Sequence, residues 1–384
     1  MSMTRLIRQS KRRKWIYAAA LLAVVLAGYI PGTNLILALR LLLAIRGLAL
    51  GETGQGLPVV ESVIHLRSEG KELEALLYLP SRSLPTRAIV LSPGISELGW
   101  HHPQLIALSR FLADCGFLVL TPDLQKFREF QISAEPVEEM VFWARAVPAL
   151  QEARQVRHIG FAGISFSGTM ALIAAARPEV RDSTAFVLGI GSYFNLQTLT
   201  HEWFAPETET AGKGYYPTRF YARWLIMQAA LGILPMENER QFLHTVLNDL
   251  LRQNKVPPSD PPGLSPEGLR WYSLAVNETQ SDPILAAQIE NNLRPLLDQK
   301  LDPTQAAGDL RCPVFLVHGA YDDLISPDQS RQLKHHIERA NSYLLITPFL
   351  THTHAIEKPL SRSEKLRALL AGFGFLYNFA RVLR

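Results

Sequence analysis

Eight short apolar segments, separated by longer segments with helical spacing, constrain the fold of this chain more than any other feature. They are Val59–Leu66, Glu72–Leu79, Arg87–Leu91, Phe117–Thr121, His158–Ala162, Thr184–Ile190, Pro313–Val317 and Ser342–Ile346. The first two alternate polar with apolar residues, as in a half-exposed antiparallel pair, whereas Ala88–Leu91 is apolar throughout, as in a buried parallel strand. Helical segments between the later strands imply right-handed crossovers. We expect an α/β fold with an eight-stranded, mostly parallel, doubly wound sheet.

The alternation stops between the sixth and seventh predicted strands. Residues 192–308 contain no convincing strand, and the stretches with helical spacing there are Arg219–Leu231, Glu239–Gln253 and Pro283–Gln299. A long segment of this kind within an α/β domain is typical of an insertion that covers the sheet. The predicted organisation is therefore an α/β core at residues 52–191 and 309–384, with a helical cap at residues 192–308.

The N-terminal residues 1–51 differ in composition from the rest of the chain. The uncharged stretch Trp15–Ile30 follows the basic run Lys11–Lys14, which is the pattern of a membrane anchor or a signal peptide. A second apolar stretch, Leu35–Leu50, carries Arg40 and Arg46, which favour a helix in the membrane interface over the return half of a hairpin. We expect residues 1–51 to anchor the protein in the cell inner membrane, and a single span would leave the folded part facing outward.

Net charge gives little support to a nucleic-acid partner. Residues 1–51 contain eight of the 39 Lys and Arg residues and no Asp or Glu, which leaves 31 basic residues against 35 acidic ones in residues 52–384. The excess of positive charge therefore belongs to the N-terminal segment, and we predict no nucleic-acid binding.

The sharpest motif follows the fifth predicted strand. Gly163-Ile164-Ser165-Phe166-Ser167-Gly168 leads into a predicted helix, Thr169–Ala176. It resembles the nucleophile elbow of the α/β-hydrolase family, which implies an α/β-hydrolase fold with Ser165 as nucleophile. In such an elbow the residues two before and two after the serine must be small, and here these are Gly163 and Ser167. Ser167 departs from the family pattern G-x-S-x-G.

A serine nucleophile needs a base and a carboxylate that orients the base. The segment from Gly319 to Pro327 is similar to the family's G-x-x-D-x-x-V-P loop, and the resemblance assigns the acid to Asp322, with Asp323 as the alternative. After the last strand the family position of the base falls on His352, with His354 as the alternative. A His-x-His pair can also bind a metal, but no Cys or carboxylate motif with ligand spacing accompanies it, so no metal is expected.

The resemblance also indicates where an oxyanion would be stabilised. One N–H would come from Phe166, directly after the nucleophile, and the other from Ile95, in the loop that follows the third strand. The glycines form no phosphate-binding fingerprint, so no cofactor is expected.

The function implied by the resemblance is that of a serine hydrolase. It would cleave a carboxylic ester or related acyl bond through Ser165, His352 and Asp322 and an acyl-enzyme, acting on a small-molecule or lipid-like acyl substrate. The alternatives are an acyltransferase or peptidase with the same triad, or a catalytically silent membrane-bound binding protein with this fold.

Overall fold

The computed structural model describes residues 32–49, 51–205, 218–252, 261, 263–277, 281–337, 341–350 and 360–383. The predicted membrane segment Trp15–Ile30 and the two candidate bases, His352 and His354, lie outside the described residues.

All eight predicted strands are confirmed, each with ends within two residues of the prediction. They are β1 (Val59–Ser68), β2 (Lys71–Pro80), β3 (Arg87–Ser92), β4 (Phe117–Pro122), β5 (His158–Ile164), β6 (Thr184–Ile190), β7 (Val314–Gly319) and β8 (Ser342–Thr347). They form one sheet in the order β1-β2-β4-β3-β5-β6-β7-β8. Pairing is antiparallel between β1 and β2 and between β2 and β4, and parallel from β4 to β8. The carboxyl ends of the parallel strands therefore meet at one edge of the sheet.

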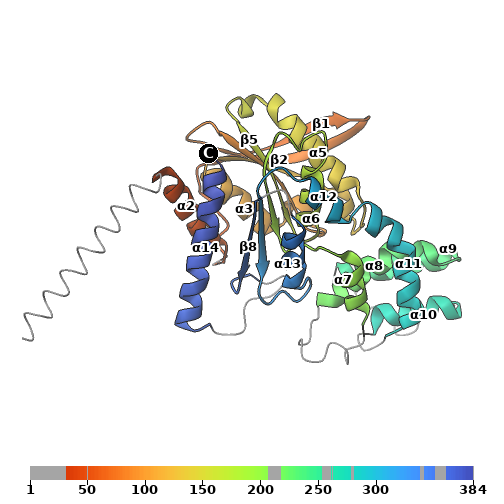
Figure 1. Ribbon diagram of the computed structural model, residues 1–384. Helices are drawn as coiled ribbons and strands as arrows, with labels where there is room; N and C mark the ends of the chain where they lie inside the picture. Colours follow the sequence, from red (N-terminus) through yellow and green to blue (C-terminus); the bar gives the residue numbers. More distant parts are fainter. Residues whose placement is uncertain are drawn as a thin grey trace, which may run out of the picture.

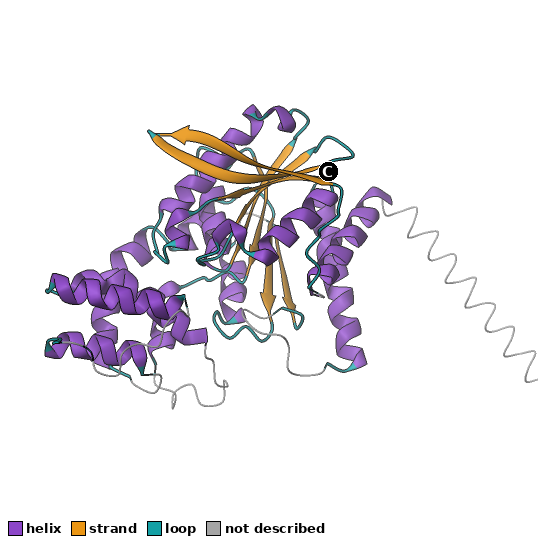
Figure 2. Ribbon diagram, turned by 180° about the vertical axis from the view of Figure 1, so that it is seen from behind, coloured by secondary structure: helices purple, strands orange, loops and turns teal. Residues whose placement is uncertain are grey.

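Helices cover both faces of the sheet, as expected of a doubly wound fold (Figures 1 and 2). One face carries α2 (Gly32–Ala49), α3 (Pro103–Asp114) and α14 (Arg362–Val382), and the other carries α5 (Glu135–Ala146), α6 (Phe166–Ala175), α12 (Pro303–Asp309) and α13 (Pro327–His336). The short helix α4 (Gln125–Arg128) and the 3₁₀ turns η1 (Gly99–His101), η2 (Val147–Ala149) and η3 (Gln151–Ala153) lie in connections. Burial of apolar side chains such as Phe117 and Phe161 on each face supplies the main stabilisation.

Between β6 and β7 the described residues form further helices and no strand. These are α7 (Leu196–Phe204), α8 (Thr218–Ala230), η4 (Leu231–Ile233), α9 (Glu237–Leu251), α10 (Pro266–Val276) and α11 (Pro283–Gln299). Figure 1 shows them gathered on one side of the molecule, away from the β1–β2 hairpin. Their apolar side chains belong to the same buried cluster as those of α5 and α6, so the helical insertion is packed onto the sheet domain.

The second apolar stretch of the N-terminal segment forms α2, which buries Leu37, Ala38 and Leu41 in the same cluster as α3 and α14. The outer side of this helix exposes Ile36 and Leu43, by 59% and 62%. In the part of the chain that the structure describes, no helix combines the length and the apolar character needed to cross a membrane.

Candidate active site

Ser165 lies at a sharp turn between β5 and α6. Its backbone has φ 60° and ψ −126°, a conformation that costs a residue with a side chain free energy and is concentrated at functional sites. The Ser165 N–H donates to the carbonyl of Ile190 at 2.7 Å, which fixes the turn to the neighbouring strand β6. Helix α6 begins at Phe166, three residues earlier than the sequence indicates, because the turn itself directs the chain into the helix.

The two small residues of the elbow have different roles. A Cβ added to Gly163 would lie 2.6 Å from the Gly168 nitrogen and closer still to the Ser167 carbonyl, so this position requires glycine. Ser167 is fully buried, and its Oγ accepts from the Ile164 N–H at 2.8 Å. The same hydroxyl lies 2.9 Å from the carbonyl oxygens of Ser92 and Ile164. Ser167 therefore ties the elbow to the end of β3, which gives its departure from glycine a structural reason.

The loop after β3 lies beside the elbow. A Cβ added to Gly94 would be 3.5 Å from the Ser165 Cβ and 3.4 Å from the Ile164 carbonyl oxygen. The next residue, Ile95, is 9% exposed. Phe166 opens α6, where the first N–H groups have no partner within the helix. The two candidate oxyanion residues therefore belong to two segments that both adjoin Ser165.

Asp322 follows β7 in a tight loop and is almost entirely buried, with a side chain 4% exposed. Its Oδ1 accepts from the N–H groups of Leu324 and Ile325, at 3.0 and 2.8 Å, and these bonds hold the loop in shape. Its Oδ2 lies 3.4 Å from Nε2 of His318, a fully buried residue at the end of β7. Asp323 is partly buried in the same loop.

Hydrogen bonds to both ring nitrogens hold the His318 imidazole in place. Its Nε2 lies 2.8 Å from the Ile325 carbonyl, which can only accept, so this nitrogen carries a proton. Its Nδ1 lies 2.6 Å from the Ser330 hydroxyl. The imidazole therefore joins β7, the Asp322 loop and α13.

The segment that carries the candidate bases begins next to the Asp322 loop. β8 ends at Thr347, which pairs with Gly319 at the end of β7. Asp322 follows Gly319 by three residues, and His352 follows Thr347 by five. Both segments therefore leave the sheet at the same edge as Ser165.

Strand order and the elbow together decide the fold. Two leading antiparallel strands, six parallel ones and a serine at positive φ between a central strand and its helix define one architecture. The chain has an α/β-hydrolase fold. No family model and no curated protein matches the sequence.

Solved structures with resemblance to the chain include several hydrolases. An esterase from Pyrobaculum calidifontis has 15% identity and a TM-score of 0.48, with 89% of this chain and 92% of that chain covered. Est1E from Butyrivibrio proteoclasticus, solved with bound ferulic acid, has 15% identity and a TM-score of 0.45, with 83% and 99% covered. An acylaminoacyl peptidase from Pyrococcus horikoshii has 15% identity and a TM-score of 0.43, covering 77% of this chain, which spans only 38% of the peptidase. Similarity at this level leaves the reaction to be argued from the chain's own residues.

The helical insertion contacts two of the site loops of this hydrolase fold. Trp203, in α7, donates its indole N–H to the Leu324 carbonyl in the Asp322 loop at 3.0 Å. Tyr221, in α8, donates its hydroxyl to the Ile95 carbonyl at 2.9 Å. Burial raises the pKa of Tyr221, so its hydroxyl stays protonated and remains a donor.

No motif in the sequence marks His318 or Tyr221 as a site residue. One signal could have identified His318. It is a histidine near the end of a buried strand, four residues before the candidate acid. No local pattern distinguishes Tyr221, because its partner is 126 residues away. Among the described residues, no group of three or more His, Cys, Asp or Glu is arranged to hold a metal ion.

Proposed function

We propose that this protein is a serine hydrolase that cleaves carboxylic esters, with Ser165 as nucleophile, His352 as base and Asp322 as the orienting acid. The observation that carries the proposal is the backbone of Ser165, a residue with a side chain held at φ 60° at the carboxyl edge of the sheet. Such strain persists only where the surrounding structure enforces it, and it directs the side chain away from both β5 and α6.

The mechanism follows from the positions of the groups. The Ser165 Oγ attacks the acyl carbonyl while His352 takes its proton, and the N–H groups of Ile95 and Phe166 stabilise the oxyanion of the tetrahedral intermediate. His352 then gives the proton to the departing alcohol, which leaves an acyl-enzyme on Ser165. Water, deprotonated by His352, releases the acid and restores the serine.

Chain length is compatible with His352 as the base. Five residues beyond Thr347 can span up to about 17 Å. The β8 strand lies three positions from β5 in the sheet, or about 14 Å at the usual strand spacing. His352 is therefore within the limit that chain length sets for a base of Ser165. His354 satisfies the same limit and stays the alternative.

The substrate class is part of the proposal. Apolar side chains of the insertion belong to the same buried cluster as Phe166, and this supports an acyl group of a small-molecule or lipid-like ester. No cofactor or metal is required by this mechanism. Transfer to an alcohol or amine, or cleavage of a peptide, would use the same residues, and analysis of the products of acyl-enzyme breakdown separates these reactions.

Labelling with a fluorophosphonate probe tests the nucleophile. Wild-type protein and Ser167→Ala are expected to label, whereas Ser165→Ala is not, because Ser167 Oγ is committed to the backbone of Ile164 and Ser92. Ser167→Ala also controls for damage to the elbow, since it removes a buried acceptor at a cost of about 1–3 kcal/mol. Labelling of Ser165→Ala, or of neither the wild type nor Ser167→Ala, would contradict the proposal.

The proposal includes a lipid surface as the partner of the N-terminal segment, at the cell inner membrane with the hydrolase facing outward. On the outer side of α2, Ile36, Leu39 and Leu43 follow the spacing i, i+3, i+7 and are 59%, 44% and 62% exposed. Arg46 accompanies them, as in helices that lie on anionic membranes, whereas Arg40 pairs with Asp114 of α3 at 3.0 Å.

Cosedimentation with vesicles that contain anionic lipid tests this contact. The full-length double variant Ile36→Glu, Leu43→Glu is expected to bind less than the wild type, and Ile284→Glu, at a 68%-exposed position of α11, is the matched control. Equal binding of all three proteins would remove α2 from the proposed interface. Protease accessibility in intact cells tests the outward orientation.

A further inference from the structure

Two helices of the insertion hold the loop that carries the candidate oxyanion donor Ile95. The Tyr221 hydroxyl of α8 donates to the Ile95 carbonyl at 2.9 Å. Two residues along the loop, Glu97 pairs with Arg252, at the end of α9, at 2.6 Å. The second pair is half-exposed and contributes little free energy, so the part-buried Tyr221 bond is the main link between the insertion and this loop.

The two insertion residues that make these contacts, Tyr221 and Arg252, also pack against Phe130, whose backbone geometry is strained. Phe130 has φ 56° and is 2% exposed. The Tyr221 ring packs edge-on against it at 6.4 Å, and the Arg252 guanidinium lies over its ring at 5.5 Å. In addition, Gln228 of α8 donates to the carbonyl of Glu129 at 3.3 Å. A bulky residue at positive φ costs free energy, so its environment must enforce this geometry.

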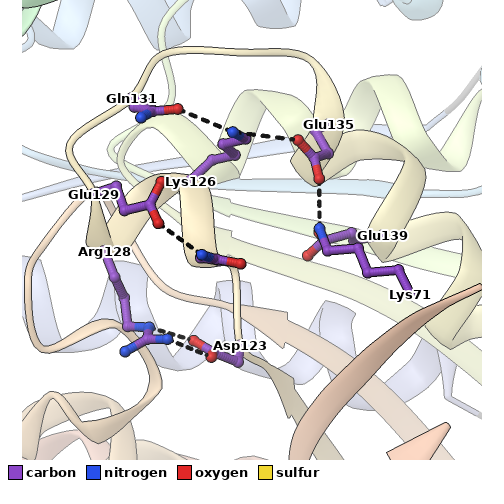
Figure 3. Close-up of polar contacts among 9 residues, drawn as sticks. Lys71, Asp123, Lys126, Arg128, Glu129, Gln131, Glu135 and Glu139 are labelled. Carbon is purple, nitrogen blue, oxygen red and sulfur yellow. Dashed lines mark hydrogen bonds and ion pairs between the residues drawn. The ribbon is translucent and has the colours of Figure 1, made fainter. Parts of the chain in front are cut away.

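Polar contacts tie the segment around Phe130 to the sheet (Figure 3). Arg128 pairs with Asp123 at 2.7 Å, Lys126 donates to Gln131 at 3.1 Å, and Lys71 of β2 bridges Glu135 and Glu139 at 2.5 and 3.2 Å. The segment that carries Phe130 is therefore anchored to the sheet independently of the insertion. Movement of α8 against this support would shift the Ile95 loop.

The geometry points to Tyr221 as a positioning residue that sets the oxyanion site through the Ile95 carbonyl. The oxyanion site is therefore competent only when the helical insertion is docked on the sheet domain. This inference rests on the proposed hydrolase function. An oxyanion donor acts only when it lies about 2.7–3.1 Å from the developing charge. Fixing the Ile95 carbonyl limits rotation of the residue whose N–H is that donor. In this role Tyr221 acts through the Ile95 carbonyl.

Tyr221→Phe removes the hydroxyl and keeps the ring that packs on Phe130. With a p-nitrophenyl ester, the full-length variant is expected to lose about tenfold in kcat, less than the 10²–10³-fold cost of deleting a donor outright, while KM stays within about twofold. Affinity for a trifluoromethyl ketone, which forms a tetrahedral oxyanion on the serine, is expected to fall by the same factor as kcat/KM.

Tyr193→Phe is the matched control. Its hydroxyl also donates to a backbone carbonyl far along the chain, that of Leu301 at 2.9 Å, in a buried bond, and the substitution keeps the ring in place. Its kcat is expected to stay within about twofold of the wild type. The inference is overturned if both variants lose kcat equally, or if Tyr221→Phe lowers thermal stability while ketone affinity is unchanged. Wild-type kinetics in Tyr221→Phe would refute this inference alone, whereas unlabelled wild-type protein would refute the hydrolase proposal.

Discussion

Substitution of Gly163 by alanine tests the elbow directly. The added Cβ would lie 2.6 Å from the Gly168 nitrogen, 0.8 Å short of the 3.4 Å at which ordinary van der Waals contact begins. The Gly168 nitrogen and the still closer Ser167 carbonyl both belong to the backbone, so no side chain can rotate away to relieve the overlap. The elbow must therefore shift by a distance close to 1 Å, and with it the Ser165 side chain.

The expected losses of activity and stability follow from this shift. A misplacement of about 1 Å in a reacting group can cost about 10²-fold in rate, and overpacking costs about 1–3 kcal/mol of stability. We expect Gly163→Ala to lose about 10²-fold in kcat/KM for a p-nitrophenyl ester and to unfold a few degrees below the wild type.

Gly372→Ala provides the control, because this glycine lies inside α14 and its added Cβ would have no atom within 4 Å. Replacement of a glycine inside a helix by alanine is expected to stabilise the protein by about 0.5–1 kcal/mol without change in activity. Activity of Gly163→Ala within about twofold of the wild type would refute the view that Ser165 depends on this close approach.

Two further predictions concern stability and pH. Burial raises the pKa of Glu139 despite the opposing attraction of Lys71, and its Oε2 has no hydrogen-bond partner among the described residues. Because the folded state then binds the proton more tightly, the stability linked to this group is present below about pH 4.5 and is lost as pH rises through the raised pKa. Urea unfolding between about pH 4 and 7 should show this decline in the wild type and in the exposed control Glu152→Gln, and a flatter profile in Glu139→Gln; parallel profiles would contradict the assignment. Asp282 caps α11 by accepting from the Leu285 N–H at 2.9 Å, and its hydrogen bonds to Arg270, both 2.8 Å, lower its pKa. Asp282→Ala is expected to cost about 1–2 kcal/mol at neutral pH, and Asp282→Asn less because it keeps the cap. The stability that the ionised carboxylate contributes is present above about pH 3.8 and is lost as pH falls through the lowered pKa. The difference in free energy of unfolding between wild type and Asp282→Asn should therefore close in acid. An unchanged urea midpoint in Asp282→Ala would refute the capping role.

The strands of this protein could be predicted from local sequence because their signal is local. Apolar runs such as Arg87–Leu91 and Phe117–Thr121 have the length and uniformity of buried parallel strands, and the structure extends each by one residue. The elbow is equally local, since Gly163 and Ser167 meet a steric demand set within five residues. Helices α8, α9 and α11 were likewise found from their spacing, with ends displaced by up to two residues.

Contacts between distant segments needed the tertiary structure. Tyr221 and Ile95 are 126 residues apart, and Trp203 and Leu324 are 121 apart, so no periodicity in the sequence relates them. The burial of His318 between the Asp322 loop and α13 also depends on how α13 packs back onto β7. Local patterns determine which segments become strands, helices and the elbow, because backbone sterics and alternation act within a few residues. Which side chain of the insertion supports which loop is decided only when those segments pack, because a hydrogen bond depends on position in space and not on separation along the chain.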